Sequence, residues 1–220
     1  MDTQQLSRRN FLYESGKYSA TTLLAFAFGA GIRRSVAGTN GKIALVYATR
    51  YGATKDIAHW IAEGIHQPIS VFDLAETDTR ELVSKYDRVI LGSPIFTGEP
   101  VQIMLDFMKK QAIHLDNKVV ATFVVCGTRP NSEKNKQRIA GYLASLNEPL
   151  IGKPLLTAHF GGRMILDKLT DEHRESMRFF YKNILKRELV SWDRTDPEAA
   201  KRFGTSIRRH FSFAAKADKV

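Results

Sequence analysis

Five short apolar segments of strand length, interspersed with segments of helical periodicity, constrain the fold of this chain more than any other feature. The candidate strands are residues 43–48, 69–74, 88–91, 119–126 and 155–160. A continuous apolar run of this length is typical of a strand that is buried on both faces of a parallel sheet. Strands that alternate with helices predict a doubly wound α/β fold with right-handed crossovers.

Two segments near the C-terminus predict further helices. After residue 162, apolar residues follow the spacing of a helix that covers a core; they are Met177, Phe180, Tyr181, Ile184 and Leu185. The pair Asp196-Pro197 predicts an N-cap followed by proline in the first helical turn. We expect this last helix to turn three residues inward and the chain to fray after residue 211; the inward residues are Ala200, Phe203 and Ile207.

The first 37 residues indicate an export signal. Arg8 and Arg9 lie in the segment 7–12, an apolar stretch covers 20–31, and 35–37 is a small-x-small cleavage pattern. The arginine pair followed by Phe-Leu resembles the twin-arginine signal of bacteria, which exports folded proteins. We therefore expect a periplasmic or otherwise exported protein, whose mature domain covers 42–212 and whose tail is 213–220. The alternative is an N-terminal amphipathic helix with a chance arginine pair.

Composition narrows the function classes. Lys and Arg number 33 against 23 Asp and Glu, a net charge of +10 that favours anionic partners such as phosphate cofactors, nucleic acid or acidic lipid. The sequence has no stripe of basic and aromatic residues of the kind that binds nucleic acid, and its six histidines show no metal-ligand spacing. The single cysteine, Cys126, excludes an intrachain disulfide and a Cys-clustered zinc site. No apolar run reaches the ~20 residues of a transmembrane helix.

The residues that can carry chemistry lie in loops at strand ends, where open parallel sheets bind ligands. The first of these loops, Thr49 to Thr54, directly precedes a helix. Its hydroxyls, its glycine and the free amides of the helix start suit a phosphate monoester. It is neither a Walker A loop nor a Gly-x-Gly-x-x-Gly loop. The alternative is a capped turn in which Thr49 and Thr54 only satisfy backbone groups.

Three such loops in order resemble those of the flavodoxin superfamily. Thr49, Gly52 and Thr54 match that family's pattern for holding the FMN phosphate, whereas Tyr51 departs from it because it lacks an aliphatic hydroxyl. We call 49–54 the phosphate loop, 92–98 the first ring loop and 125–128 the second ring loop. The resemblance implies FMN as cofactor and a three-layer α/β/α sandwich around a five-stranded parallel sheet of order 2-1-3-4-5. The implied FMN contacts are Thr49, Arg50, Tyr51, Gly52, Ala53, Thr54, Ser93, Pro94, Ile95, Phe96, Thr97, Gly98, Cys126, Gly127 and Thr128.

Several of these residues have two interpretations. Arg50 either pairs with the FMN phosphate or points to solvent, and Ile95 and Phe96 either contact the flavin ring or pack the loop. Cys126 ends a buried strand, which favours an inert thiol near the ring over a redox nucleophile. No side chain in the loops is an obvious proton-transfer catalyst, so no catalytic residue is predicted. Basic residues near the C-terminus favour a solvated helix face over a docking patch; they are Lys182, Lys186, Arg187, Arg208 and Arg209.

Within the superfamily, the chain is most similar to the branch that contains menaquinone-dependent protoporphyrinogen oxidase. The similarity lies in the form of the phosphate loop, the polar stretch 129–138, the segment 159–163 and the pair Trp192-Asp193. It implies an exported FMN-binding redox protein, either an electron carrier or an oxidoreductase that acts on a porphyrinogen- or quinol-like donor, with the redox partner unspecified. The alternative is a flavodoxin-fold binding or scaffold domain without flavin, which Tyr51 favours.

Overall fold

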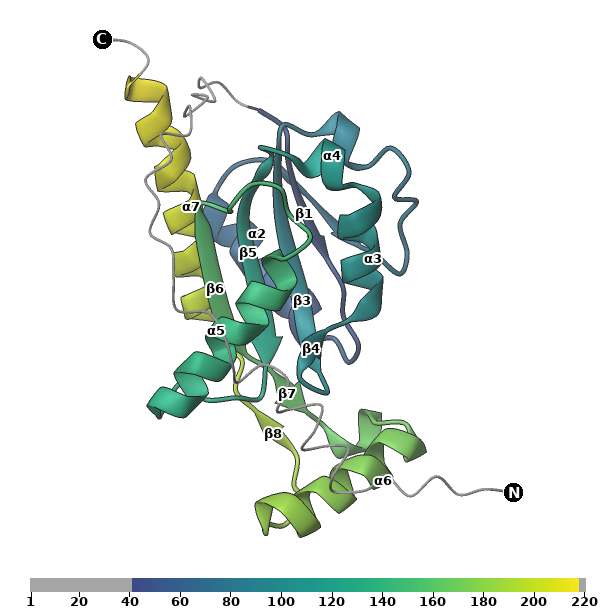
Figure 1. The fold of residues 1–220 in the computed structure, drawn as a ribbon. Coiled ribbons are helices and arrows are strands. Elements are labelled where there is room, and N and C mark those ends of the chain that lie inside the picture. Colours follow the sequence, from purple (N-terminus) through teal and green to yellow (C-terminus); the bar gives the residue numbers. More distant parts are fainter. Residues whose placement is uncertain (1–40, 218–220) are drawn as a thin grey trace, which may run out of the picture. The chain divides into compact units, whose positions relative to one another are not determined.

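A parallel sheet of five strands forms the centre of the protein in a computed structural model that describes residues 41–217, with side chains described to residue 210 (Figure 1). Its order is β2-β1-β3-β5-β6, which in counting order is the predicted 2-1-3-4-5. The predicted flavodoxin-like α/β fold is therefore confirmed. The strands are β1 (Ile43–Tyr47), β2 (Ile69–Asp73), β3 (Arg88–Phe96), β5 (Val119–Cys126) and β6 (Leu156–Gly161).

The two faces of the sheet bury separate apolar cores because alternate side chains of a strand point to opposite faces. In β1, Ile43, Leu45 and Tyr47 belong to the core under α2 (Ala53–Ile65) and α7 (Pro197–Ala217). Ala44 and Val46 belong to the core on the other face. That second core is covered by α3 (Gln102–Lys110), α4 (Ala112–Leu115), α5 (Glu133–Asn147) and η1 (Val83–Lys85). These layers make the predicted α/β/α sandwich.

The last helix packs against α2 through two glycines. A Cβ at Gly64 would lie 2.1 Å from the Lys201 carbonyl oxygen, and one at Gly204 would lie 2.2 Å from that of Ile61. The predicted start is confirmed, since Asp196 Oδ1 accepts a hydrogen bond of 2.9 Å from the Ala199 N–H. The predicted inward residues, Ala200, Phe203 and Ile207, all pack into the core. The helix continues to Ala217, beyond the expected fraying point.

The third strand is longer than predicted. It was expected to end at Leu91, but it continues to Phe96 and turns back into β4 (Glu99–Pro100). The β1 pairing ends at Gly92, so the strand beyond it has a sheet partner on one side only and tolerates Pro94. Thr97 (φ 51°) and Gly98 (φ 95°) form the two-residue hairpin turn, which requires positive φ at both positions. The first ring loop is therefore largely a hairpin.

A segment from 163 to 193, here called the inserted segment, lies between β6 and α7. Its ends, β7 (Arg163–Met164) and β8 (Trp192–Asp193), pair as a small antiparallel sheet. Between them are η2 (Leu166–Lys168), α6 (Asp171–Phe180), which Thr170 caps, and the π-helical turn η3 (Tyr181–Leu185). Figure 1 shows α6 outside both helical layers.

The prediction that this helix covers a core is wrong. Neither α6 nor η3 contains a buried residue, and Ile184 and Leu185 are 38% and 40% exposed. The spacing of apolar residues correctly predicted a helix, because periodicity reflects local geometry. It does not determine what lies opposite the apolar face, and this helix projects beyond the sheet. Within residues 41–217, no helix combines the length and apolarity needed to cross a membrane.

The predicted export signal, residues 1–37, lies outside the described residues.

Candidate functional site

The phosphate loop makes a tight turn between β1 and α2. Gly52 adopts φ 85°, a left-handed conformation that glycine tolerates without a steric penalty. Its N–H donates to Thr49 Oγ1 at 3.1 Å. As the N-cap residue of α2, Gly52 offers no side-chain acceptor to the N–H groups of the first helical turn. The start of α2 therefore presents donors that an anion can accept.

Thr54, in the first turn of α2, is 1% exposed. Its Oγ1 is buried and has no hydrogen-bond partner among the described residues. Leaving a buried hydroxyl unsatisfied costs about 1–3 kcal/mol. A phosphate oxygen at the start of α2 would accept from this hydroxyl and from the free N–H groups. The loop thus fits the phosphate of FMN.

A cluster of four side chains joins the phosphate loop to the first ring loop and to α6. Arg50 lies over the Phe96 ring, with Cζ 3.8 Å from the ring centroid, and its Nη2 donates to His173 Nε2 at 2.9 Å. Tyr51 Oη forms a hydrogen bond with His173 Nδ1. Because arginine has only donors, Nε2 must accept, and a neutral His173 then carries its proton on Nδ1. The Phe96 and His173 rings also meet edge to face, with centroids 5.0 Å apart. Three predicted FMN contacts, Arg50, Tyr51 and Phe96, therefore contact the inserted segment.

His173 was not predicted from the sequence. It lies 123 positions from Arg50 and belongs to a helix that was expected to be structural. No spacing pattern indicates such a contact, since the fold alone brings α6 next to the phosphate loop.

Arg163 also lies against the phosphate loop. A Cβ on Gly52 would be 3.3 Å from Arg163 Nη2. The guanidinium forms an ion pair of 2.5 Å with Asp56 of α2 and a longer one of 4.0 Å with Asp193 of β8. Partial burial raises the pKa of Asp193, but hydrogen bonds from Thr195 and the charge of Arg163 outweigh it and hold this pKa below its usual value. The sequence showed Arg163 only as part of the segment 159–163, without a role.

The first ring loop divides into an inner and an outer part. Ser93 is fully buried; its Oγ donates to the Pro94 carbonyl at 3.0 Å and accepts from the Val101 N–H at 3.2 Å. Its hydroxyl therefore ties the end of the sheet to the start of α3. Ile95 and Phe96 are half-buried, and Thr97 and Gly98 are exposed at the tip of the hairpin.

The second ring loop begins beside the first, because Pro94 of β3 pairs with Val125 of β5. Cys126 is buried and unpaired, and burial raises the pKa of its thiol. A buried thiol with a raised pKa stays protonated and is therefore a poor nucleophile. Gly127 is exposed, and its carbonyl accepts a hydrogen bond of 2.6 Å from Arg194 Nη1. The fold thus brings all three predicted loops to the carboxyl edge of adjacent strands, β1, β3 and β5.

A doubly wound sheet with a tight glycine turn between its first strand and the following helix, flanked by the ends of two neighbouring strands, is the architecture typical of nucleotide-binding α/β domains. The family model of the flavodoxin domain matches residues 44–188. The chain belongs to this flavodoxin-domain family.

Solved structures with similarity to the chain include flavodoxins and a longer protein. A flavodoxin from the domain Archaea is 18% identical, with 78% of this chain and 99% of that chain covered and a TM-score of 0.48. Flavodoxin 1 from Bacillus cereus is 19% identical, with 77% of this chain and 98% of that chain covered and a TM-score of 0.47. The Flv1 flavodiiron core from Synechocystis is 15% identical, with 80% of this chain but only 37% of that longer chain covered and a TM-score of 0.49. No curated protein matches the chain.

Proposed function

We propose that this protein binds FMN and works as an exported redox protein. The observation that carries the proposal is the buried Thr54 hydroxyl, which has no partner among the described residues and lies where α2 begins. Membership of the flavodoxin-domain family supports the same cofactor.

Each loop would have a separate task in holding the cofactor. Thr54 and the first N–H groups of α2 would hold the phosphate, and Gly52 allows the backbone to approach it closely. The hairpin of the first ring loop and the exposed backbone at Gly127 would border the ring system. Bound FMN supplies the electron-transfer chemistry. The protein's own part is to bind, orient and partly shield it.

We propose a small donor, porphyrinogen-like or quinol-like, in the oxidoreductase form of this function. The support is the sequence similarity in the segment 159–163 and in Trp192-Asp193. In the structure Arg163, at the end of the first segment, pairs with Asp193 in the sheet of β7 and β8 and lies beside the phosphate loop. The electron-carrier form of the function needs a protein partner instead, and it makes the same demand on the FMN site.

One observation favours a flavin-free binding domain as the second candidate. Arg50 covers the Phe96 ring, and Tyr51 and Arg50 both bond to His173. Three residues that were predicted to contact FMN, Arg50, Tyr51 and Phe96, therefore contact one another or the inserted segment.

The absorption spectrum of the purified protein separates the two candidates. The FMN function predicts the two visible bands of an oxidised flavin, after purification or after reconstitution with FMN. A protein that stays colourless and gives no saturable binding of FMN in calorimetry would establish the second candidate and reject the first.

Export is a separate part of the proposal and rests on the segment 7–12. Replacing Arg8 and Arg9 with lysines keeps the charge and removes the arginine pair. We expect the precursor to accumulate in the cytoplasm, as measured by cell fractionation and immunoblotting. Unchanged delivery to the periplasm would reject the twin-arginine assignment.

A further inference from the structure

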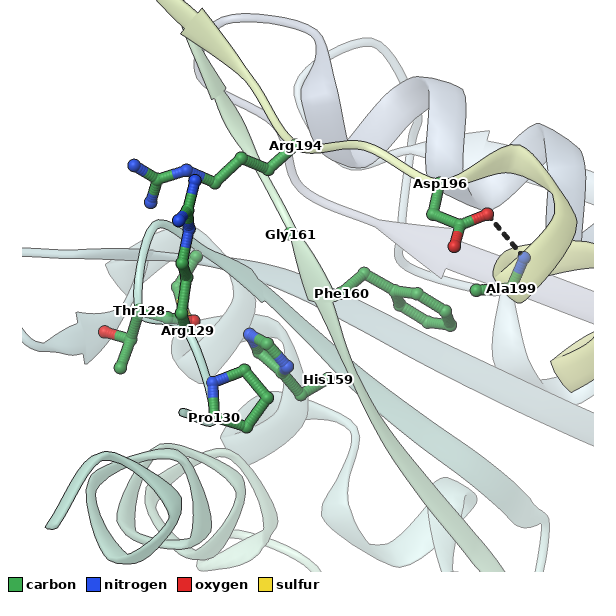
Figure 2. A pocket seen from close by; sticks show the side chains of 10 residues that line it. Thr128, Arg129, Pro130, His159, Phe160, Gly161, Arg194, Asp196 and Ala199 are labelled. Carbon is green, nitrogen blue, oxygen red and sulfur yellow. Dashed lines mark hydrogen bonds between the residues drawn. The ribbon is translucent and has the colours of Figure 1, made fainter. Parts of the chain in front are cut away.

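A pocket of about 300 Å³ lies on the β6 side of the second ring loop (Figure 2). It is lined by the loop after β5, the end of β6 and the segment that leads into α7. It shares Cys126 and Thr128 with the second ring loop and no residue with the phosphate loop. Its remaining lining is therefore not explained by the proposed FMN site.

The pocket has an excess of positive charge. The side chains of Arg129 and Arg194 extend toward each other at one side of it (Figure 2), and neither forms an ion pair with a carboxylate of the described residues. Burial, and then the charge of Arg129, lower the pKa of Arg194. The one acidic residue of the lining is Asp196, and its Oδ1 already accepts from the Ala199 N–H at 2.9 Å.

Arg194 is held in place by the protein itself. Its guanidinium lies 4.2 Å from the centroid of the Trp192 ring, and its Nη1 donates to the Gly127 carbonyl. These contacts orient the guanidinium and leave its Nε buried without a partner among the described residues. An ordered arginine loses less freedom on binding an anion than a mobile one.

A second buried polar atom lies in the same pocket. His159 Nε2 also has no partner in the described part of the chain, and burial lowers the pKa of this ring. In Figure 2 its ring lies next to Pro130, on the opposite side of the β6 ribbon from the Phe160 ring. The pocket therefore combines charged and polar groups with apolar surface from Pro130 and Ala199, whereas the Phe160 side chain is buried against Phe123 and Phe203. This combination suits a ligand with an anionic head and an apolar body.

We propose that this pocket binds a small organic anion, whose carboxylate or phosphate group contacts Arg129 and Arg194 and whose flat or apolar body lies against Pro130 and the His159 ring. The inference does not require bound flavin, since the phosphate loop and the hairpin take no part in it.

Calorimetric titration of the purified full-length protein tests the proposal with four probes. Benzoate and phenyl phosphate carry the two anionic heads on one body, benzyl alcohol is their neutral counterpart, and inorganic phosphate lacks the body. We expect saturable binding of benzoate or phenyl phosphate, with the tighter one identifying the head group, and weaker binding of the other two probes. Binding should also change the fluorescence of Trp192 in a Trp60→Phe background, because Trp192 packs on Arg194.

A matched pair of variants separates direct contact from net charge. Arg129→Gln removes an exposed guanidinium of the pocket, and Arg138→Gln removes an exposed one on α5 that does not line it. We expect Arg129→Gln to weaken binding about five-fold or more, and Arg138→Gln to leave it unchanged. Circular dichroism checks that both variants fold.

Four results would overturn the proposal: no saturable binding of either aromatic anion, equal weakening by both variants, tight binding of inorganic phosphate alone, or loss of binding in the presence of FMN. The titrations are repeated with saturating FMN. If FMN abolishes binding, the pocket belongs to the flavin site and is not a separate one. If the protein fails to bind FMN but still binds benzoate, the proposed function fails and this inference stands.

Discussion

Replacing Thr54 with valine should change the stability of the FMN-free protein and its affinity for FMN in opposite directions. Valine keeps the shape of a side chain that is 1% exposed and removes a hydroxyl that has no partner among the described residues. An unsatisfied buried hydroxyl costs about 1–3 kcal/mol, so its removal should stabilise the free protein by about 1 kcal/mol or more. For a domain of this size, that raises the melting temperature by about 2–4 °C.

The same substitution should weaken FMN binding. A hydrogen bond to a charged group contributes about 1.5–3 kcal/mol, which corresponds to a rise in Kd of about 10- to 150-fold. Thermal unfolding of the FMN-free protein and titration with FMN and riboflavin measure the two effects. Riboflavin lacks the phosphate, so its affinity should be unaffected. Equal losses for both ligands would mean that Thr54 does not contact the phosphate.

Thr122→Val is the matched control. Thr122 is fully buried in β5, and its hydroxyl likewise has no partner among the described residues. It lies between Leu91 and Thr157 in the sheet, away from the strand ends. This variant should stabilise the free protein in the same way and leave FMN affinity unchanged. A similar loss of FMN affinity in both variants would refute the assignment of the phosphate to Thr54.

Three further predictions concern the fold. Gly98 has φ 95° and no atom within 4 Å of the position of a Cβ. Gly98→Ala should therefore lower the free energy of unfolding only through backbone strain, by about 1–2 kcal/mol, and Gly98→Asn should lower it less. Equal losses of stability in urea unfolding would contradict this. Gly64→Ala should destabilise the folded protein by about 3 kcal/mol, because the new Cβ would overlap the backbone of Lys201. Gly141→Ala on α5 places its Cβ in open space and should stabilise the folded protein by about 0.5–1 kcal/mol. Burial lowers the pKa of His159 from its usual 6.5, so its neutral form contributes stability above pH 6.5 that is lost as the pH falls toward the lowered value. His159→Gln should therefore lose less stability than wild type between about pH 7 and 5, and parallel urea-unfolding profiles would reject this cause.

The fold was predictable because its determinants are local. The all-buried run from Ile43 to Tyr47 and the cap at Asp196 are properties of neighbouring residues, and the structure confirms both. The end of β3 was missed because Gly92 and Pro94 are unfavourable inside a central strand. Pro94 is tolerated because β1 stops pairing at Gly92, and a glycine is needed at 92 because a Cβ there would lie 2.1 Å from Phe123 Cζ. Both reasons are properties of the sheet. The exposure of Ile184 and Leu185 could not be predicted either, because their spacing predicts a helix and does not determine what packs against its apolar face.

The site was predictable only in its loops. The phosphate loop and the two ring loops follow strands, so their meeting at one edge follows from the fold. The residues that the sequence could not assign come from the inserted segment. Arg163 reaches Asp56, and His173 reaches Arg50 and Tyr51, across more than a hundred positions of sequence. Such contacts carry no periodicity, and they depend on how β7 and β8 position the segment.

Buried polar atoms without a partner are unevenly distributed over the described residues. Six side-chain atoms are in this state, and four belong to Thr54, His159, Arg163 and Arg194. These four lie near or beyond the carboxyl ends of the strands, where folds of this type bind ligands. Because each such atom costs about 1–3 kcal/mol, several of them in one region favour a bound group or ordered water there. Thr54 lies at the phosphate loop, whereas His159 and Arg194 line the separate pocket beside β6. Their separation favours two anionic groups at this edge of the sheet, one on either side of the second ring loop.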